Sequence, residues 1–248
     1  MKIFRQVSFP APTPHHLLAL AKLTLTLRVT GVRPDGLHLL DAEMTTVDLA
    51  DELEITEGDG LEVVDAPPGA ALPADETNLV RRALLAAGRT AHVRLHKRIP
   101  VGAGLGGGSA DAAAVLRWAG ITDPGVAAAL GADVPFCLVG GRARVTAIGE
   151  VLEPLAFEDR VFTLLSPPLA VSTPAVYRAW DDLGGPTADG GNDLEPAALA
   201  VEPRLAVWRD RLGEATGLIP RLAGSGGTWF VEGAHPGPGL VTVRTARP

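Results

Sequence analysis

The stretch that decides the fold is PVGAGLGGGSADAAAVL, residues 100–116. Glycines occupy positions 102, 104, 106, 107 and 108, Ser109 follows, and an alanine-rich run begins. Glycine lets successive backbone amides point inward without a Cβ clash, and a helix N-terminus adds free N–H groups and partial positive charge. The stretch therefore predicts a phosphate-binding loop that opens into a helix from about Ser109 to Trp118, in preference to a merely flexible turn.

Two common phosphate-binding loops do not fit these residues. A P-loop needs a Lys-Ser/Thr pair after its last glycine, whereas Gly108 is followed by Ser109-Ala110-Asp111. The dinucleotide fingerprint needs a different glycine spacing and an acidic residue that closes the second strand. Here GADVPFCL (131–138) is predicted to place Asp133 before a strand. A different cradle remains, built as strand, glycine loop and helix.

Composition limits the class of protein. The 248 residues are 46% hydrophobic, enough for a substantial core. The net charge of −7 argues against a nucleic-acid partner, and the lone Cys137 excludes a disulfide framework and a cysteine-based zinc site. No stretch approaches the roughly 18 uninterrupted apolar residues of a membrane span, and the N-terminus has no convincing cleavage site. We expect a cytoplasmic protein with no membrane partner, as a monomer or weak homodimer.

Local patterns predict a mixed α+β fold without a regular βαβ rhythm. Residues 1–16 are predicted to be a poorly ordered extension. Strands are expected within 23–31, 39–56, 91–100, 160–167, 227–233 and 239–246, with a hairpin over 142–155. Helices are expected over 76–88, 172–183 and twice between 193 and 214, and residues 123–141 are predicted as a short helix, a turn and a strand. We place a boundary near 155, between a nucleotide-binding, catalytic domain (1–155) and a substrate-side domain (156–248).

Further motifs accompany the glycine loop in a fixed order. They are AKLTLTLRVTGVRPDGLHLL (21–40), LGADVPFCLVGGRARVTAIGE (130–150), VSTPAVYRAWD (171–181), GNDLEPAA (191–198) and LAGSGGTWFV (222–231). In this order they resemble the GHMP small-molecule kinases, and among these the branch that phosphorylates 4-diphosphocytidyl-2-C-methyl-D-erythritol. The resemblance implies a two-domain fold. Its N-terminal nucleotide domain is similar to domain 2 of ribosomal protein S5, and its C-terminal domain is ferredoxin-like.

The resemblance also implies a reaction, namely phosphorylation of the 2-hydroxyl of that substrate in the non-mevalonate route to isoprenoids. It implies ATP and Mg²⁺ as cofactors, and it leaves the metal ligands unassigned. Two alternatives stay open: another GHMP kinase acting on a different small alcohol, and a non-catalytic nucleotide-binding relative. Retention of both Lys22 and Asp133 argues against the second alternative, because a pure binder needs no base.

The resemblance implies that Asp133 is the catalytic base. The alternative is that Asp133 is a structural aspartate in a turn. Lys22 lies in an apolar strand, where an unpaired lysine is costly to bury. Pairing with Asp133 removes that cost; the alternative is an edge-strand lysine with a solvated head.

The nucleotide and substrate residues follow from the matched motifs. For ATP they are Pro100, Gly102, Gly104, Leu105, Gly106, Gly107, Gly108, Ser109, Asn78 and Lys97. For the substrate they are His38, Thr24, Tyr177, Thr173, Gly224 and Ser225. Structural alternatives stay open for several: a helix cap for Asn78 (or Thr77), Ser109 and Thr173, a solvated strand lysine for Lys97, a core tyrosine for Tyr177, and a simple turn for Gly224-Ser225.

The sequence departs from the family pattern at several points. Thr24 replaces an asparagine, Leu37 replaces an aromatic residue before His38, and Ala110 replaces a second serine. The segments from Leu116 to Gly131 and after the 224–226 loop are short. Loss of one face of a base sandwich costs about 1–3 kcal/mol, so we expect altered or weaker cytidine recognition.

Overall fold

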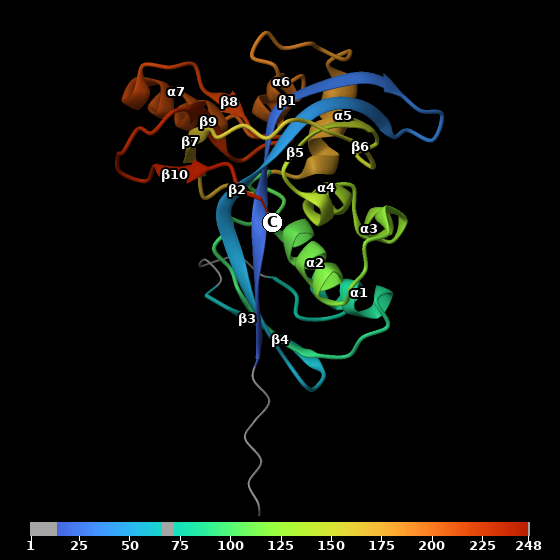
Figure 1. Ribbon diagram of the computed structural model, residues 1–248. Helices are drawn as coiled ribbons and strands as arrows, with labels where there is room; N and C mark the ends of the chain where they lie inside the picture. Colours follow the sequence, from blue (N-terminus) through green and yellow to red (C-terminus); the bar gives the residue numbers. More distant parts are fainter. Residues whose placement is uncertain (1–13, 66–71, 248) are drawn as a thin grey trace, which may run out of the picture.

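A computed structural model describes residues 14–65 and 72–247 (Figure 1). Its strands are β1 (His15–Val32), β2 (His38–Thr56), β3 (Gly60–Val64), β4 (His92–His96), β5 (Arg142–Ala147), β6 (Val151–Pro154), β7 (Val161–Leu165), β8 (Arg221–Leu222), β9 (Trp229–Glu232) and β10 (Val241–Arg244). Its helices are α1 (Leu79–Ala86), α2 (Gly107–Trp118), α3 (Pro124–Leu130), α4 (Val134–Val139), α5 (Thr173–Asp182), α6 (Glu195–Val201) and α7 (Leu205–Thr216). The predicted mixture of helices and strands is confirmed.

The first sheet is built on the long hairpin of β1 and β2. The full length of β1 pairs antiparallel with one edge of β2, and β4 and β5 share the other edge. The outer strands β3 and β6 then pair with β4 and β5. Helices α2 and α4 contact β1, and α1 and α3 pack on α2, so Figure 1 shows these four helices on one side of the hairpin.

Strand β1 is buried on both faces at its centre, which explains its mixed composition. One face carries apolar side chains into the core: Ala19, Ala21, Leu23, Leu25 and Leu27. The opposite face carries the buried polar residues Lys22 and Thr24. The pairing with β2 shifts register between Leu20 and Lys22 and again between Thr24 and Thr26. Bulges of this kind re-aim side chains beside functional sites.

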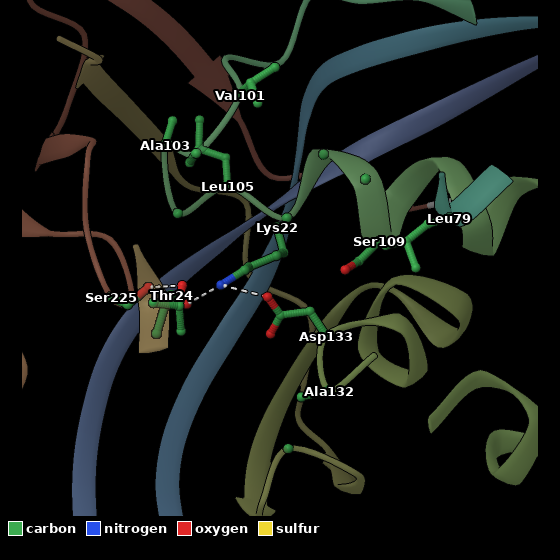
Figure 2. Close-up of a pocket in the computed structure, with 18 of the residues that line it drawn as sticks. Lys22, Thr24, Leu79, Val101, Ala103, Leu105, Ser109, Ala132, Asp133 and Ser225 are labelled. Carbon is green, nitrogen blue, oxygen red and sulfur yellow. Dashed lines mark hydrogen bonds and ion pairs between the residues drawn. The ribbon is translucent and has the colours of Figure 1, made fainter. Parts of the chain in front are cut away.

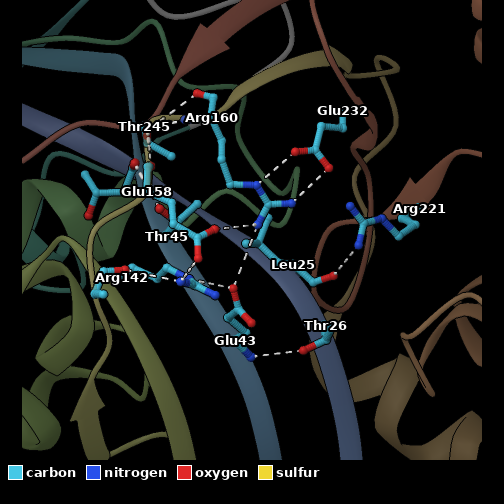
Figure 3. Close-up of polar contacts among 12 residues, drawn as sticks. Leu25, Thr26, Glu43, Thr45, Arg142, Glu158, Arg160, Arg221, Glu232 and Thr245 are labelled. Carbon is cyan, nitrogen blue, oxygen red and sulfur yellow. Dashed lines mark hydrogen bonds and ion pairs between the residues drawn. The ribbon is translucent and has the colours of Figure 1, made fainter.

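A second sheet, in the order β10-β7-β9-β8, forms from the C-terminal part of the chain. Charged side chains join it to the first sheet (Figure 3). Arg160, next to β7, lies with its Nη1 3.9 Å from Glu43 of β2, and Arg221 of β8 donates to the Leu25 carbonyl of β1 at 3.4 Å. Two isolated bridges, Leu27 with Asn192 and Val47 with Thr245, also link the two parts. The boundary near 155 stays a prediction; it falls between the end of β6 and the start of β7.

Two local predictions are wrong. Residues 1–13 lie outside the described part of the chain, but His15 and His16 already pair with Ile55 and Glu54, so the expected extension does not reach residue 16. Residues 134–139 form helix α4 and not a strand. Nearly all of its side chains are buried, and a short run that is apolar on every face has no periodicity to separate a helix from a strand.

Candidate active site

Every candidate site residue lines one pocket of about 850 Å³. The pocket lies where the glycine loop, the start of β2, the residue before α4, helix α5 and the 224–225 turn meet. These segments are far apart in the sequence, and the two sheets bring them together. The structure thus places in one cavity the residues that the motifs indicated separately.

Lys22 and Asp133 meet, as predicted. The Lys22 Nζ lies 3.3 Å from the Asp133 carboxylate and donates a hydrogen bond to Thr24 Oγ1 at 3.0 Å (Figure 2). The lysine side chain is 5% exposed and that of Asp133 is 34% exposed. The ammonium is therefore buried with its partners, whereas the carboxylate stays open to the pocket. The alternative of an edge-strand lysine with a solvated head is excluded.

Asp133 sits at the N-cap position of α4 but makes no capping hydrogen bond with its side chain. The predicted turn before Asp133 is present, and the following helix, not a strand, holds it. Phe136 and Cys137 on α4 are buried, and burial raises the pKa of the Cys137 thiol to about 12. Asp133 thus lies at the start of a buried apolar helix, and its carboxylate makes no capping hydrogen bond.

The glycine loop packs directly on the 223–228 segment. A Cβ added to Gly104 would lie 2.3 Å from the Ala223 carbonyl oxygen, and φ at Gly104 is +77°. The Thr228 amide donates to the Ala103 carbonyl at 3.0 Å, and the Lys22 amide donates to the Leu105 carbonyl at 3.0 Å. Backbone-to-backbone contact of this kind requires glycine at position 104. The two glycine-rich motifs therefore form one surface around Lys22.

Helix α2 begins at Gly107, two residues earlier than predicted. Its N-cap is Gly106 in the left-handed conformation, so Ser109 is not the cap. Ser109 lies instead in the first turn, among amides that have no intrahelical acceptor, and Figure 2 shows its side chain among those that line the pocket. The predicted helix-and-loop cradle is therefore present, with the serine hydroxyl free of a capping role.

Two predicted nucleotide residues are occupied by structural contacts. Asn78 caps α1, since its Oδ1 accepts from the Val80 amide at 2.9 Å, and its Nδ2 donates to the Pro73 carbonyl at 2.8 Å. Lys97 is buried next to Gly107, which excludes the alternative of a solvated strand lysine. Its Nζ binds Asp51 and, at 2.8 Å, Asp111. Both residues line the pocket, and their contact with ATP stays a prediction.

Sequence reasoning missed Asp51 and Asp111, the two partners of Lys97, of which Asp111 lines the pocket. Asp51 also accepts from the Arg98 and Ile99 amides, at 2.6 and 2.8 Å, and so fixes the entry to the glycine loop. Asp111 Oδ1 is buried without a hydrogen-bond partner among the described residues. Burial raises the pKa of Asp111 to about 7, against the pull of the Lys97 charge. For Lys97, burial lowers the pKa, but Asp111 and Asp51 outweigh it and the net shift is upward.

Two of the substrate-side residues, His38 and Tyr177, pack together on the α5 side of the pocket. The His38 ring lies 4.7 Å from the Tyr177 ring and 5.5 Å from that of Trp180, centroid to centroid. Its Nε2 lies 2.8 Å from Asp181 Oδ1. Leu37, where the family pattern has an aromatic residue, is 46% exposed. Burial raises the pKa of Tyr177, so its phenol stays protonated.

Thr173 is the first residue of α5, and the N-cap is Ser172. The Thr173 and Ser225 hydroxyls lie 2.7 Å apart, so α5 and the 224–226 turn meet at the pocket. Asn192 supports this turn and was missed as a functional residue, although its motif was recognised. Its Nδ2 donates to the carbonyls of Leu222 and Gly224 at 2.8 and 2.7 Å.

The described residues hold no group of three or more His, Cys, Asp or Glu that is placed to bind a metal ion. Within residues 14–65 and 72–247, no helix has the length and apolar character needed to cross a membrane.

Comparison with known proteins points to one family. The model of the GHMP kinases N terminal domain matches residues 78–141. The 4-diphosphocytidyl-2-C-methyl-D-erythritol kinase of Cereibacter sphaeroides (strain ATCC 17029 / ATH 2.4.9) is 40% identical over 241 residues, covering 86% of this chain and 87% of that protein. The protein of the same name from Ruegeria pomeroyi (strain ATCC 700808 / DSM 15171 / DSS-3) is 41% identical and covers 85% of each chain.

Solved structures agree. A crystal structure of 4-(cytidine 5'-diphospho)-2C-methyl-D-erythritol kinase has a TM-score of 0.68 and 36% identity, covering 87% of this chain and 89% of that one. The mevalonate kinase of L. major, at 12% identity and a TM-score of 0.61, shares the fold alone. With its ordered motifs, its paired Lys22 and Asp133 and these relatives, the chain belongs to the 4-diphosphocytidyl-2-C-methyl-D-erythritol kinase family of the GHMP kinases.

Proposed function

We propose that this protein transfers the terminal phosphoryl group of ATP to the 2-hydroxyl of 4-diphosphocytidyl-2-C-methyl-D-erythritol. The observation that carries the proposal is the ion pair of Lys22 and Asp133, 3.3 Å apart, in a pocket walled by two glycine-rich segments. Phosphoryl transfer depends mainly on positioning and charge stabilisation, which this arrangement supplies. The acceptor alcohol is the one for which the related kinases are named.

In this proposal Asp133 accepts the proton of the attacking hydroxyl. Its carboxylate is open to the pocket, and the ammonium of Lys22 holds it in one orientation. Thr24 and the Gly224 segment fix the lysine in turn, since Thr24 accepts its hydrogen bond and a Cβ on Gly224 would lie 3.4 Å from Nζ. The lysine charge also offsets negative charge that builds up on the transferred phosphoryl group.

The glycine loop and the first turn of α2 suit a triphosphate. Gly102, Gly104 and Gly106 all have positive φ, and a Cβ on Gly106 would fall 2.7 Å from the Lys22 side chain, so the cradle has no room for larger residues. Free amides of the first helical turn and the Ser109 hydroxyl face that space. The Ser109 hydroxyl is an oxygen donor of the kind that Mg²⁺ takes when phosphates and water complete its shell. The metal would neutralise phosphate charge.

The test is ADP release from Mg-ATP with 4-diphosphocytidyl-2-C-methyl-D-erythritol as acceptor. We expect turnover by the unmodified protein and a loss of at least about 100-fold in Asp133→Asn, because general-base catalysis contributes at least that factor. Asp123→Asn is the matched control, since Asp123 caps α3 through its Oδ1 and an asparagine keeps that bond. Turnover only with another alcohol, such as mevalonate or homoserine, would replace the proposed acceptor. ATP binding without any turnover would favour a non-catalytic relative.

A further inference from the structure

Asp181 and His38 form a contact that the proposed reaction does not use. His38 begins β2 and Asp181 lies in the last turn of α5, 143 residues further along the chain. The two residues line the α5 side of the pocket, and His38 Nε2 lies 2.8 Å from Asp181 Oδ1. The His38 side chain is 9% exposed, whereas that of Asp181 is 47% exposed.

Asp181 is not explained by the stability of its helix. An acidic side chain in the last turn opposes the helix dipole, which favours basic residues there. Both Asp181 and its neighbour Asp182 occupy such positions. Of the two, only Asp181 makes a side-chain hydrogen bond with another described residue. Its placement therefore points to a role in the pocket.

The contact decides which nitrogen of the imidazole carries the proton. An ionised carboxylate can only accept hydrogen bonds, so Nε2 must be the donor. In a neutral imidazole the other nitrogen is then an acceptor. No hydrogen bond to His38 Nδ1 is made by the described residues, so this lone pair is available to a ligand in the pocket. The ring packs against Tyr177 and Trp180 of α5, at centroid distances of 4.7 and 5.5 Å.

We propose that Asp181 is a specificity-determining residue, which sets His38 Nδ1 as a hydrogen-bond acceptor and so selects cytosine over uracil. Cytosine presents an amino donor at position 4, whereas uracil presents a carbonyl acceptor at the same place. The lone pair on His38 Nδ1 accepts a hydrogen bond from the cytosine amino group and repels the uracil carbonyl oxygen. The inference rests on the proposed function for the presence of a pyrimidine beside His38.

The replacement of an aromatic residue by Leu37 makes this hydrogen bond more important. Stacking on an aromatic ring is tolerant of the base, because every base has a π-face. Hydrogen bonds to base edges distinguish one base from another. A pocket that offers less stacking and keeps the oriented ring should thus bind nucleotides more weakly but still discriminate between them.

The experiment compares CDP and UDP as probes by calorimetry, at about pH 8, for the unmodified protein, Asp181→Ala and Asp182→Ala. Asp182→Ala is the matched control, since it removes the same charge from the same turn. We expect the unmodified protein to prefer CDP by at least about tenfold. Asp181→Ala should lower the ratio of the UDP dissociation constant to the CDP dissociation constant by about tenfold, because CDP binding is weakened more than UDP binding. Asp182→Ala should leave this ratio unchanged. A general electrostatic gain from removing one negative charge affects both probes alike and cancels in the ratio.

The ratio of kcat/KM for the cytidine and uridine forms of the substrate should move in parallel, while the KM for ATP stays constant. An unchanged ratio of dissociation constants in Asp181→Ala overturns the inference, as does an equal change in Asp182→Ala. Binding and turnover separate the two proposals. A preference for CDP that depends on Asp181, without turnover, rejects the proposed reaction and supports this inference. Turnover with a ratio of dissociation constants that Asp181→Ala does not change supports the proposed reaction and rejects this inference.

Discussion

Replacing Gly104 by alanine should separate the two glycine-rich segments that wall the pocket. The new Cβ would lie 2.3 Å from the Ala223 carbonyl oxygen and 2.8 Å from that of Gly226, so backbone must move on at least one side. The left-handed conformation at φ +77° adds strain of about 1–2 kcal/mol for any residue with a Cβ. Overpacking against a backbone adds about 1–3 kcal/mol more.

Gly120→Ala is the matched control. Gly120 has the same φ of +77°, but a Cβ there would meet nothing within 4 Å, so only the strain remains. In urea denaturation we expect Gly104→Ala to lower the unfolding free energy by roughly 2–5 kcal/mol and Gly120→Ala by roughly 1–2 kcal/mol.

Kinetics should separate the two variants further. A displacement of the loop by about 1 Å costs about 100-fold in rate, so kcat/KM should fall by that factor in Gly104→Ala and stay near the original value in Gly120→Ala. Equal stability and equal kinetics in the two variants would refute the conclusion that the glycine loop and the 223–226 segment support one another through backbone contact.

Three further predictions concern buried polar groups. Lys22→Met should lower kcat/KM at least about 100-fold. The unfolding free energy should change by less than about 1 kcal/mol, because methionine fills the space of the lysine methylene chain and Asp133 stays hydrated. Unfolding of the variant would contradict this prediction. Asp111 has a folded pKa of about 7, above its unfolded value of about 3.9, so its stabilising contribution is complete below pH 4 and is lost as the pH rises to 7. Asp111→Asn should therefore gain stability relative to the original protein across that range, and a constant difference in unfolding free energy would argue against a protonated Asp111. Asn192→Ala removes the hydrogen bonds to two buried carbonyls, at about 1–3 kcal/mol each, so denaturation should show an unfolding free energy lower by roughly 2–6 kcal/mol. A decrease of less than about 1 kcal/mol would mean that the 222–224 segment does not depend on Asn192 for its stability.

The sequence by itself determined the parts of this protein whose physics is local. Five glycines before an alanine-rich run define a loop and a helix whatever surrounds them, and alternation over 23–31 defines a strand. The order of the motifs identified the family and indicated the residues that line the pocket. The capped helix after Asn78 and the hairpin over 142–155 were likewise predictable, since caps and turns act over a few residues.

Tertiary structure decided which of the polar residues meet. Residues 134–139 form a helix that packs on α2 and β1 with all its side chains except that of Val139 buried, and no pattern within six residues can reveal that packing. Lys97 is enclosed because Asp51 and Asp111, 46 and 14 residues away in the sequence, converge on its ammonium. The contacts of Asp181 with His38 and of Asn192 with the 222–224 segment are of the same kind. A side chain's hydrogen-bond partners depend on how sheets and helices pack, and that packing is a property of the whole chain.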